Sequence, residues 1–244
     1  MGYFPPHSFD ESYIMDIKGE FAPLILTNLN TPWERVLALG TPLSFPTKKI
    51  IPTVGSNTSQ DGMYYITRGR VRLSHIAPNG SEKVLFHMGK GMLFNEIPMF
   101  VAVQNAIFTA VEPTKVLFWP RHLLSLSFIK EYPDLISNLL QSLSRKASNF
   151  HIQLCAQGLF TSFINVCRAL YSMHLYQRKG ETITPHLTQH ELAAMLGVHR
   201  SSLHKALTRL KEENVIASYN KKELVVTNLE ALLYYALGDD PRGQ

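Results

Sequence analysis

The apolar residues of this chain change their spacing near Pro133, and this change limits the possible folds more than any other feature. Between about residues 43 and 119, short runs rich in Val, Ile, Phe, Tyr and Thr alternate with turn residues. After Pro133, apolar residues recur every three or four positions, as they do on one face of a helix. A chain of 244 residues also favours two domains. The pattern therefore predicts an α+β protein with a sheet domain followed by helices.

The first part of the chain contains several short runs that are typical of strands. They are KKIIPTV, MYYITRG, RVRLSHI, SEKVLFHM, AIFTAV and TKVLFWP, and Gly, Asn and Pro separate them. Asn79-Gly80 predicts a hairpin with a type I′ turn, in which both central residues have positive φ. Many short strands at regular spacing indicate an antiparallel barrel or jelly roll.

Composition and motifs narrow the functional class. The net charge of +5 mildly favours an anionic partner. Two cysteines cannot form a disulfide framework, the first twenty residues do not resemble a signal peptide, and no apolar run approaches about 18 residues. We therefore expect a cytoplasmic protein. The segment HEL at His190 begins like a zinc-protease motif but has Ala194 in place of the second histidine. The sequence also lacks the G-x-S-x-G motif and the Walker A lysine motif, so we do not expect an enzyme.

The helical part begins with a narrow apolar seam. Its residues are spaced by alternating steps of four and three, which is an a/d pattern. Such a seam can pack on its own domain or pair with the same helix of a second copy in a two-fold dimer. We expect Gly158 to end or bend this helix, a second helix to follow at about 161–176, and QRKGET to form a loop. The seam consists of Ile136, Leu140, Leu143, Ala147, Phe150 and Leu154.

Two short helices with a glycine between them follow. Thr188 and Glu191 match a capping box, and Gly197 can adopt the left-handed conformation that stops the helix QHELAAML. Helix, glycine turn and second helix form a helix-turn-helix. The segment NVIASYNKKELVV then reads as strand, turn and strand, which is a wing. From Val198 to Lys211 the second helix carries cations and no acid, and we expect Arg209 and Lys211 in its later part to be exposed as well. Because DNA presents phosphates and base acceptors, this helix predicts sequence-specific DNA binding.

The order of these parts, with KKIIPTVGSNTSQDGMYYITRGRVRL, GKGMLFNEIPMF and LTQHELAAMLGVHRSSLHKALTRLKEENVI, resembles the Crp/Fnr family of bacterial transcription regulators over about residues 41–230. The resemblance implies a homodimer, a near-palindromic operator with half-sites roughly 34 Å apart, and contact with RNA polymerase. It also implies an N-terminal arm (1–20), an effector-sensing β-roll (21–131), a dimerisation helix (132–158) and a winged helix-turn-helix domain (159–244).

The resemblance assigns DNA-contacting positions on the two short helices. Arg200 matches the base-reading arginine of the family. Ser201 stands where many members have a glutamate, and Lys205 where they have a second arginine, so we expect a different half-site and softer selectivity at Lys205. The remaining candidates match phosphate-contacting positions or can donate to bases: Thr188, Gln189, His199, Ser202 and His204.

The sensor part departs further from the family. Cyclic-AMP members have a Gly-Glu pair and an Arg-Ser pair, but this chain has Asn95-Glu96 and Gln104-Asn105 there. Without that arginine a buried cyclic phosphate would lack its charge partner, so we do not expect cyclic-nucleotide sensing. The N-terminal cysteines of the iron–sulfur members are also missing.

Within the family the chain most resembles the halorespiration regulators, which sense chlorinated phenols, through NGSEKVLF and FTAVEPT. Lys146 falls on their phenolate-binding lysine, although a lysine beside a seam commonly keeps its head group in water. Glu96 stands where they have a second lysine, and it would repel a phenolate or pair with Lys146 when no ligand is bound. The resemblance thus implies a small-molecule effector, a halogenated aromatic being one candidate. The expected effector residues are Lys146, Glu96, Asn95, Phe86, Tyr65, Phe108 and Leu143.

A heme or redox sensor is the alternative. Some family members bind heme through histidine and cysteine, and here His151 and Cys155 lie four residues apart while His87 lies on a predicted strand. Otherwise we expect no cofactor and no metal. Cys155 and Cys167 are expected to be structural.

Overall fold

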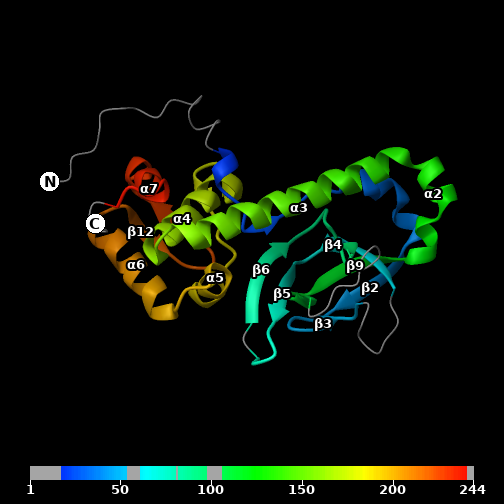
Figure 1. Cartoon of the computed structure of the whole chain (residues 1–244), viewed down its shortest axis with the longest axis horizontal. Helices are drawn as coiled ribbons and strands as arrows, with labels where there is room; N and C mark the ends of the chain where they lie inside the picture. Colours follow the sequence, from blue (N-terminus) through cyan, green and yellow to red (C-terminus); the bar gives the residue numbers. More distant parts are fainter. Residues whose placement is uncertain (1–17, 54–60, 81, 98–105, 241–244) are drawn as a thin grey trace. The chain divides into compact units, whose positions relative to one another are not determined.

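The computed structural model describes residues 18–53, 61–80, 82–97 and 106–240 (Figure 1). The chain forms two compact units. The roll unit is Ile25–Ala147, and the winged-helix unit combines Met1–Leu24 with Ser148–Gln244. The chain therefore passes from one unit to the other twice. The domain boundaries expected from the sequence remain a prediction.

The roll unit contains two sheets, as the strand pattern predicts. The five-stranded sheet has the order β1-β6-β5-β8-β3, and the four-stranded sheet has the order β2-β9-β4-β7. All pairs are antiparallel except β1 with β6. The strands are β1 (Ile25–Leu26), β2 (Thr41–Phe45), β3 (Ile50–Ile51), β4 (Gly62–Arg68), β5 (Val71–Ile76), β6 (Glu82–Met88), β7 (Leu93–Phe94), β8 (Ala106–Ala110) and β9 (Thr114–Pro120).

Aromatic rings join the two sheets. Tyr64 stacks on Phe94 at a centroid distance of 4.9 Å, and Phe94 contacts Phe108 of the other sheet at 5.1 Å. Successive side chains of a strand point to opposite faces. Tyr65 therefore lies on the outer face of the four-stranded sheet, where it meets Trp119 at 6.0 Å.

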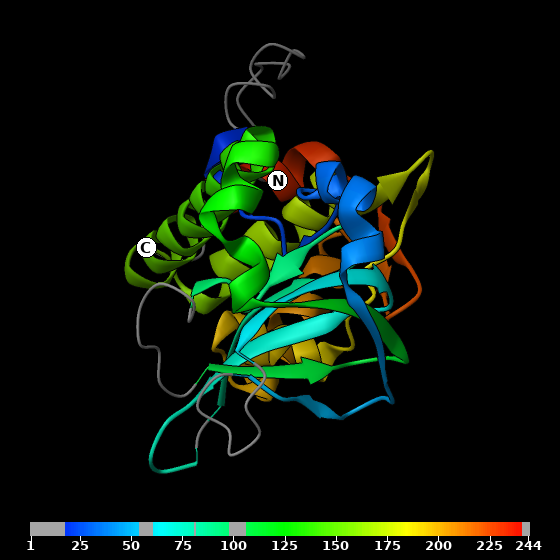
Figure 2. The same ribbon diagram turned by 90° about the vertical axis from the view of Figure 1, so that its right-hand side faces the viewer.

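Helices cover that outer face (Figure 2). The 3-10 helix η2 (Thr31–Leu39) contributes Trp33, which is fully buried and packs on Trp119. Leu135 and Leu139 of α3 (Pro133–Leu159) complete the cluster. Large rings buried in this way contribute most of the apolar area of a core. The short elements η4 (Arg121–Leu124) and α2 (Leu126–Glu131) connect β9 to α3.

The hairpin between β5 and β6 forms, but its turn differs from the prediction. The N–H of Gly80 donates to the carbonyl of Ala77 at 2.8 Å, and Gly80 has φ of 81°. Asn79 is not among the residues with positive φ. The expected type I′ turn is therefore wrong. The reason is Pro78, whose ring fixes φ near −65° and favours the second position of a type I turn.

The winged-helix unit follows the predicted order. Helix α3 has 27 residues and ends at Leu159, one residue after Gly158. It is followed by α4 (Ser162–Gln177), α5 (Gln189–Leu196) and α6 (Arg200–Glu212). The wing is β12 (Ile216–Tyr219) with β13 (Leu224–Val226), and α7 (Leu229–Ala236) closes the unit. The expected QRKGET loop instead forms the short strands β10 (Arg178–Lys179) and β11 (Thr182–Ile183), because β11 pairs with β13 of the wing.

A segment near the N-terminus is fastened to the winged-helix unit. We call Lys18–Pro23, which includes the 3-10 helix η1 (Lys18–Glu20), the N-terminal strap. Ser172 donates to the carbonyl of Ala22 at 2.7 Å, and Asn149 donates to that of Pro23 at 2.9 Å. Phe21 is 2% exposed and packs on a tyrosine ring of α4. The strap therefore adds a layer to the helical core.

Candidate functional sites

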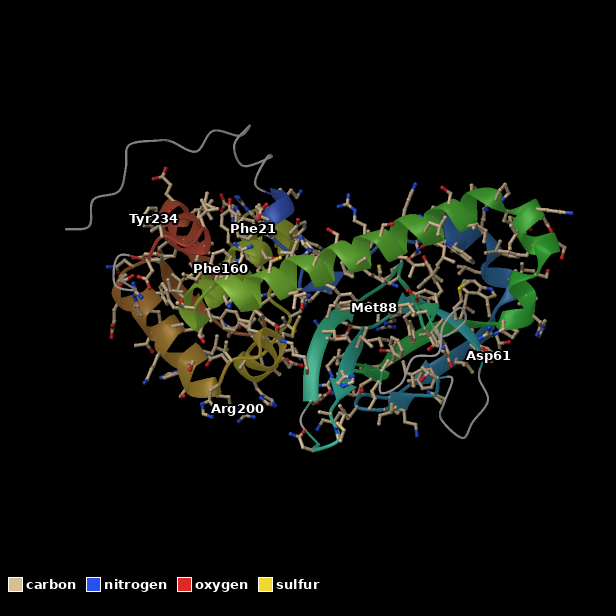
Figure 3. All side chains as sticks on the ribbon, in the orientation of Figure 1. Phe21, Asp61, Met88, Phe160, Arg200 and Tyr234 are labelled. Carbon is tan, nitrogen blue, oxygen red and sulfur yellow. The ribbon has the colours of Figure 1, made fainter. Side chains whose placement is uncertain are left out.

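Helix α6 has one apolar face and one cationic face. The apolar face is buried, with Leu203, Ala206, Leu207 and Leu210 at 4% exposure or less. The cationic face is exposed and has no acidic residue before Glu212. Figure 3 shows Arg200 pointing outward from the start of the helix. Of the predicted DNA-contacting residues, the structure exposes His199, Arg200, Ser201, His204 and Lys205, and half-buries Ser202.

Hydrogen bonds order the first turn of α6. His199 is its N-cap, and its Nδ1 accepts from the backbone N–H of Ser201 at 3.3 Å. In the neutral ring an accepting Nδ1 leaves the hydrogen on Nε2, which makes Nε2–H a donor. Arg200 donates from Nε to Nδ1 of His190 on α5 at 3.0 Å. A hydrogen bond between side chains thus joins α5 to α6 at the start of α6, where the cations are exposed.

The start of α5 forms the predicted capping box. The N–H of Glu191 donates to Oγ1 of Thr188 at 3.2 Å, and the N–H of Thr188 donates to Oε2 of Glu191 at 2.7 Å. The Thr188 hydroxyl also donates to this carboxylate at 2.8 Å, whereas Gln189 is exposed. Gly197 ends α5 with φ of 67°, in the left-handed region that glycine adopts without strain.

Arg209 does not belong to the exposed cations that the sequence suggested. Its guanidinium binds Asp240 in a bidentate pair at 2.6 and 3.0 Å and Glu213 at 3.0 Å, and lies 3.9 Å from the ring centroid of Phe163. The hydrogen bonds to Asp240 raise the pKa of Arg209 further above its ordinary value. Arg209 therefore fixes α6 to its own unit. The wing adds two exposed cations that were not assigned, Lys221 and Lys222.

Lys146 lies in the roll unit as part of a buried ion pair. Its Nζ is 2.5 Å from Oε1 of Glu96 and donates to the carbonyl of Leu93 at 2.8 Å. The side chains of Lys146 and Glu96 are only 5% and 3% exposed. Of the two alternatives for Lys146, the solvated head group is therefore wrong, because α3 presents this face to β7 and the residues that follow it. The pairing with Glu96 that the sequence analysis considered for the ligand-free protein is present.

The same face of α3 carries further polar contacts that the sequence analysis missed. Oδ1 of the fully buried Asn30 accepts from the N–H of Leu93 and from the hydroxyl of Ser142, both at 3.0 Å. Asn30 also donates to Oδ1 of Asn138 at 2.9 Å. Asn138, Ser142 and Lys146 are spaced by four residues, a pattern that the sequence alone would assign to a solvated face.

The other predicted effector residues fall into two groups. Tyr65 and Leu143 belong to the core cluster on the outer face of the four-stranded sheet, which also contains Leu93. Tyr65 donates to Glu34 at 3.1 Å, and burial raises the pKa of its phenol. Phe86 and Phe108 lie instead on strands that flank β5, each opposite Leu73. The structure therefore does not bring all predicted residues together.

Asn95 is buried next to Glu96 and has φ of 64°. Its Nδ2 donates to the carbonyl of Gly62 at 2.7 Å. Within the described part of the chain its Oδ1 is buried with no hydrogen-bond partner. The Gln104-Asn105 pair lies outside the described residues.

The seam of α3 is partly exposed in a single chain. Leu140 and Leu154 are 61% and 72% exposed, and Ala147 is exposed as well. Ile136, Leu143 and Phe150 are half-buried. An apolar row that the chain itself does not cover is typical of an interaction surface.

The residues considered for heme are placed as follows. His87 is fully buried on β6. His151 is exposed, and its Nε2 is 3.8 Å from Sγ of Cys155. In the described ranges, no three His, Cys, Asp or Glu side chains gather as ligands for a metal ion. Those ranges also contain no helix with the length and apolarity of a membrane span.

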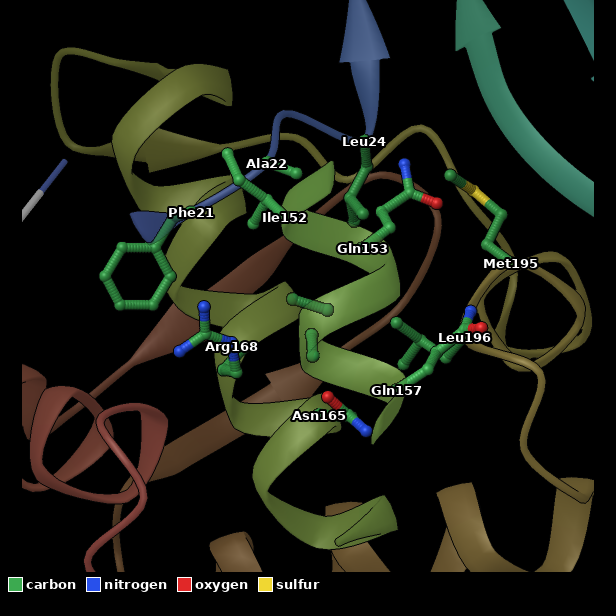
Figure 4. A pocket seen from close by; sticks show the side chains of 12 residues that line it. Phe21, Ala22, Leu24, Ile152, Gln153, Gln157, Asn165, Arg168, Met195 and Leu196 are labelled. Carbon is green, nitrogen blue, oxygen red and sulfur yellow. The ribbon is translucent and has the colours of Figure 1, made fainter. Parts of the chain in front are cut away.

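A small open cavity lies within the winged-helix unit (Figure 4). The strap, α3, α4 and the last turn of α5 line it, and its surface is mostly apolar. Arg168 borders the cavity, but its guanidinium donates to the carbonyls of Glu20 and Ala236 and stacks on Phe21. These contacts make Arg168 a structural clamp for the strap.

Comparisons with known proteins agree with this geometry. A model of the cyclic nucleotide-binding domain matches residues 43–126, and a model of the Crp-like helix-turn-helix domain matches residues 166–235. The chain is 30% identical over 155 residues to the cyclic AMP receptor protein of Thermus thermophilus, which covers 63% of this chain and 70% of that protein. This chain belongs to the Crp/Fnr family. It is a DNA-binding transcription regulator with an effector-binding domain.

Other members of the family match over longer stretches. The CRP-like cAMP-activated global transcriptional regulator of Mycobacterium tuberculosis is 28% identical over 192 residues, covering 75% of this chain and 83% of that protein. Among solved structures, CprK complexed with OCPA has a TM-score of 0.71 at 23% identity, covering 86% of this chain and 98% of that one. A CooA variant from Carboxydothermus hydrogenoformans has a TM-score of 0.73 at 18% identity, covering 86% and 100%. These structures share the fold.

Proposed function

We propose that this regulator binds a near-palindromic operator as a homodimer and that a small molecule bound in the roll unit controls it. The exposed cationic face of α6 carries the proposal, because it offers forked and single donors with no acid among them. Such a surface complements phosphates and base edges in a major groove. The helix is held from behind by the buried apolar face and by Arg209.

Selection of operators from random DNA tests sequence-specific binding. Arg200→Ala is expected to cost about 1–3 kcal/mol at one base position. Lys211→Ala is the control, since it removes a cation further along the same helix and should leave the base preference unchanged. An unaltered base preference in Arg200→Ala would exclude Arg200 as the base reader. Binding should weaken with salt, by a log–log slope of about −0.9 for each neutralised phosphate.

The exposed seam supports the dimer. Pairing two copies of α3 would cover Leu140 and Leu154, which a single chain leaves in water. Leu140→Glu is expected to yield a monomer in sedimentation experiments. The matched control is Leu39→Glu, which alters an exposed leucine of η2 and should leave the dimer intact. A wild-type monomer at micromolar concentration would contradict the proposal.

We infer that the effector acts at the Lys146–Glu96 pair. A ligand with an acidic group could compete with Glu96 for the buried ammonium and so alter the contact between α3 and β7. Cyclic AMP fits less well, since no arginine lies between Arg72 and Arg121 to hold a buried phosphate. A halogenated phenol is the candidate that the lysine favours. The coupling between effector and DNA would be typically about 1–3 kcal/mol.

A thermal-shift screen with halogenated phenols, heme and cyclic nucleotides tests this inference. Stabilisation by a phenol that Lys146→Met abolishes would support it. Stabilisation by heme, with loss in His151→Ala, would favour the heme sensor instead. Stabilisation by cyclic AMP alone would exclude the phenol.

A further inference from the structure

His190 contacts the arginine that we propose as the base reader, although no role in DNA binding follows from its sequence motif. It is the second residue of α5 and is exposed. Its Nδ1 accepts from Nε of Arg200, the first residue of α6, at 3.0 Å. In the described part of the chain this is the only side-chain partner of Arg200, and Arg200 belongs to no ion pair there.

We propose that His190 is a positioning residue that sets the base specificity of Arg200. This inference rests on the proposed function. An arginine carries one N–H on Nε and four on its terminal nitrogens. It can donate two hydrogen bonds to guanine either from its two terminal nitrogens or from Nε and one terminal nitrogen. Because Nε–H is already bonded to His190, the structure selects the terminal fork, which matches O6 and N7 of guanine.

The bond also reduces the freedom of a long side chain before DNA arrives. A free arginine on a surface samples many rotamers and loses this entropy when it binds. Fixing it beforehand lowers the cost of binding, but only for the base that fits the fixed fork. At another base, Arg200 has to break its bond to His190 in order to adapt. The contribution of His190 is therefore expected in the discrimination between bases and not in general attraction to DNA.

The geometry restricts which replacements can work. Nε of Arg200 is a donor, so residue 190 has to offer an acceptor at the place of Nδ1. Oδ1 of asparagine is the same number of bonds from Cβ as Nδ1 of histidine, so it can offer an acceptor at a similar place. Phenylalanine keeps the ring and lacks the acceptor. His190→Asn, His190→Phe and His190→Ala thus separate the hydrogen bond from the shape of the side chain.

The experiment measures Kd for the selected operator and for the same operator with the Arg200-dependent base exchanged. The discrimination ratio is Kd for the exchanged operator divided by Kd for the selected operator. His190→Ala and His190→Phe are expected to reduce this ratio about three- to tenfold, which is the range of one hydrogen bond. His190→Asn should stay within about twofold of wild type. In an Arg200→Ala background, His190→Ala should change the ratio no further. Circular dichroism and Tm of each variant show that this exposed exchange leaves the fold intact.

The proposal is overturned if His190→Ala keeps the wild-type ratio, or if His190→Asn behaves as His190→Ala does. It is also overturned if His190→Ala weakens both operators equally, since that result indicates a phosphate contact. If Arg200→Ala itself leaves base preference unchanged, the proposed role of α6 fails together with this one. If Arg200→Ala changes the preference while the His190 series does not, only the role of His190 fails.

Discussion

Removing Lys146 is expected to destabilise the roll unit strongly, because its ammonium group is buried against Glu96. Lys146→Met leaves the Glu96 carboxylate, with 3% exposure, without its counter-charge, and it leaves the carbonyl of Leu93 without this donor. Breaking one partner of a buried pair costs about 3–5 kcal/mol. At about 2–4 °C per kcal/mol for chains of this length, Tm should fall by about 6–20 °C.

The double variant isolates the cause. In Lys146→Met with Glu96→Leu, both charges are replaced by apolar groups, which is often neutral or stabilising. We therefore expect it to recover most of the lost stability in urea unfolding. Arg145→Met is the control, because Arg145 is the exposed neighbour on the same helix, and it should change stability by less than about 0.5 kcal/mol. A loss below about 1 kcal/mol in Lys146→Met, or a double variant as unstable as the single one, would refute the reasoning.

Three further outcomes follow from local geometry. Thr188→Ala removes the capping box of α5 and should cost about 1 kcal/mol in urea unfolding, whereas Thr188→Ser should cost little. Asp240→Asn weakens the bidentate pair with Arg209 and should cost about 1–3 kcal/mol by the same measurement, with no change in helix content. Burial raises the pKa of the Cys167 thiol, so a thiol reagent at pH 8 should modify only Cys155 in the native chain and both cysteines in denaturant.

Local patterns explain why much of the winged-helix unit could be predicted. A capping box, a glycine in the left-handed region and a helical apolar period depend on residues within one or two turns of each other. Thr188, Gly197 and the buried face of α6 therefore take the predicted places. The strands of the roll follow in the same way from runs of β-branched and aromatic residues between turn residues.

Long-range contacts explain what the sequence could not reveal. Arg209 carries the same charge as Lys205, but its partner Asp240 lies 31 residues further along. Asn30 meets Asn138 across 108 residues and Ser142 across 112. The pairing of Lys146 with Glu96 was considered only because of the family resemblance, and not from the pattern of the residues themselves. No periodicity identifies such partners, because a polar stripe on a helix looks the same whether water or a buried amide faces it. The turn at Pro78 was missed for a different reason, since the Asn-Gly pair beside it suggests another geometry.

The N-terminal strap makes it difficult to divide this regulator by genetic means. An isolated fragment that begins after α3 would retain α4 but lose the carbonyls of Glu20 and Ala22, to which Arg168 and Ser172 donate. A sensor fragment that keeps the strap would conversely carry Phe21 away from its site on α4 and into water. Successful dissection would require the strap to be grafted onto the recombinant C-terminal piece, for instance by circular permutation through a designed linker.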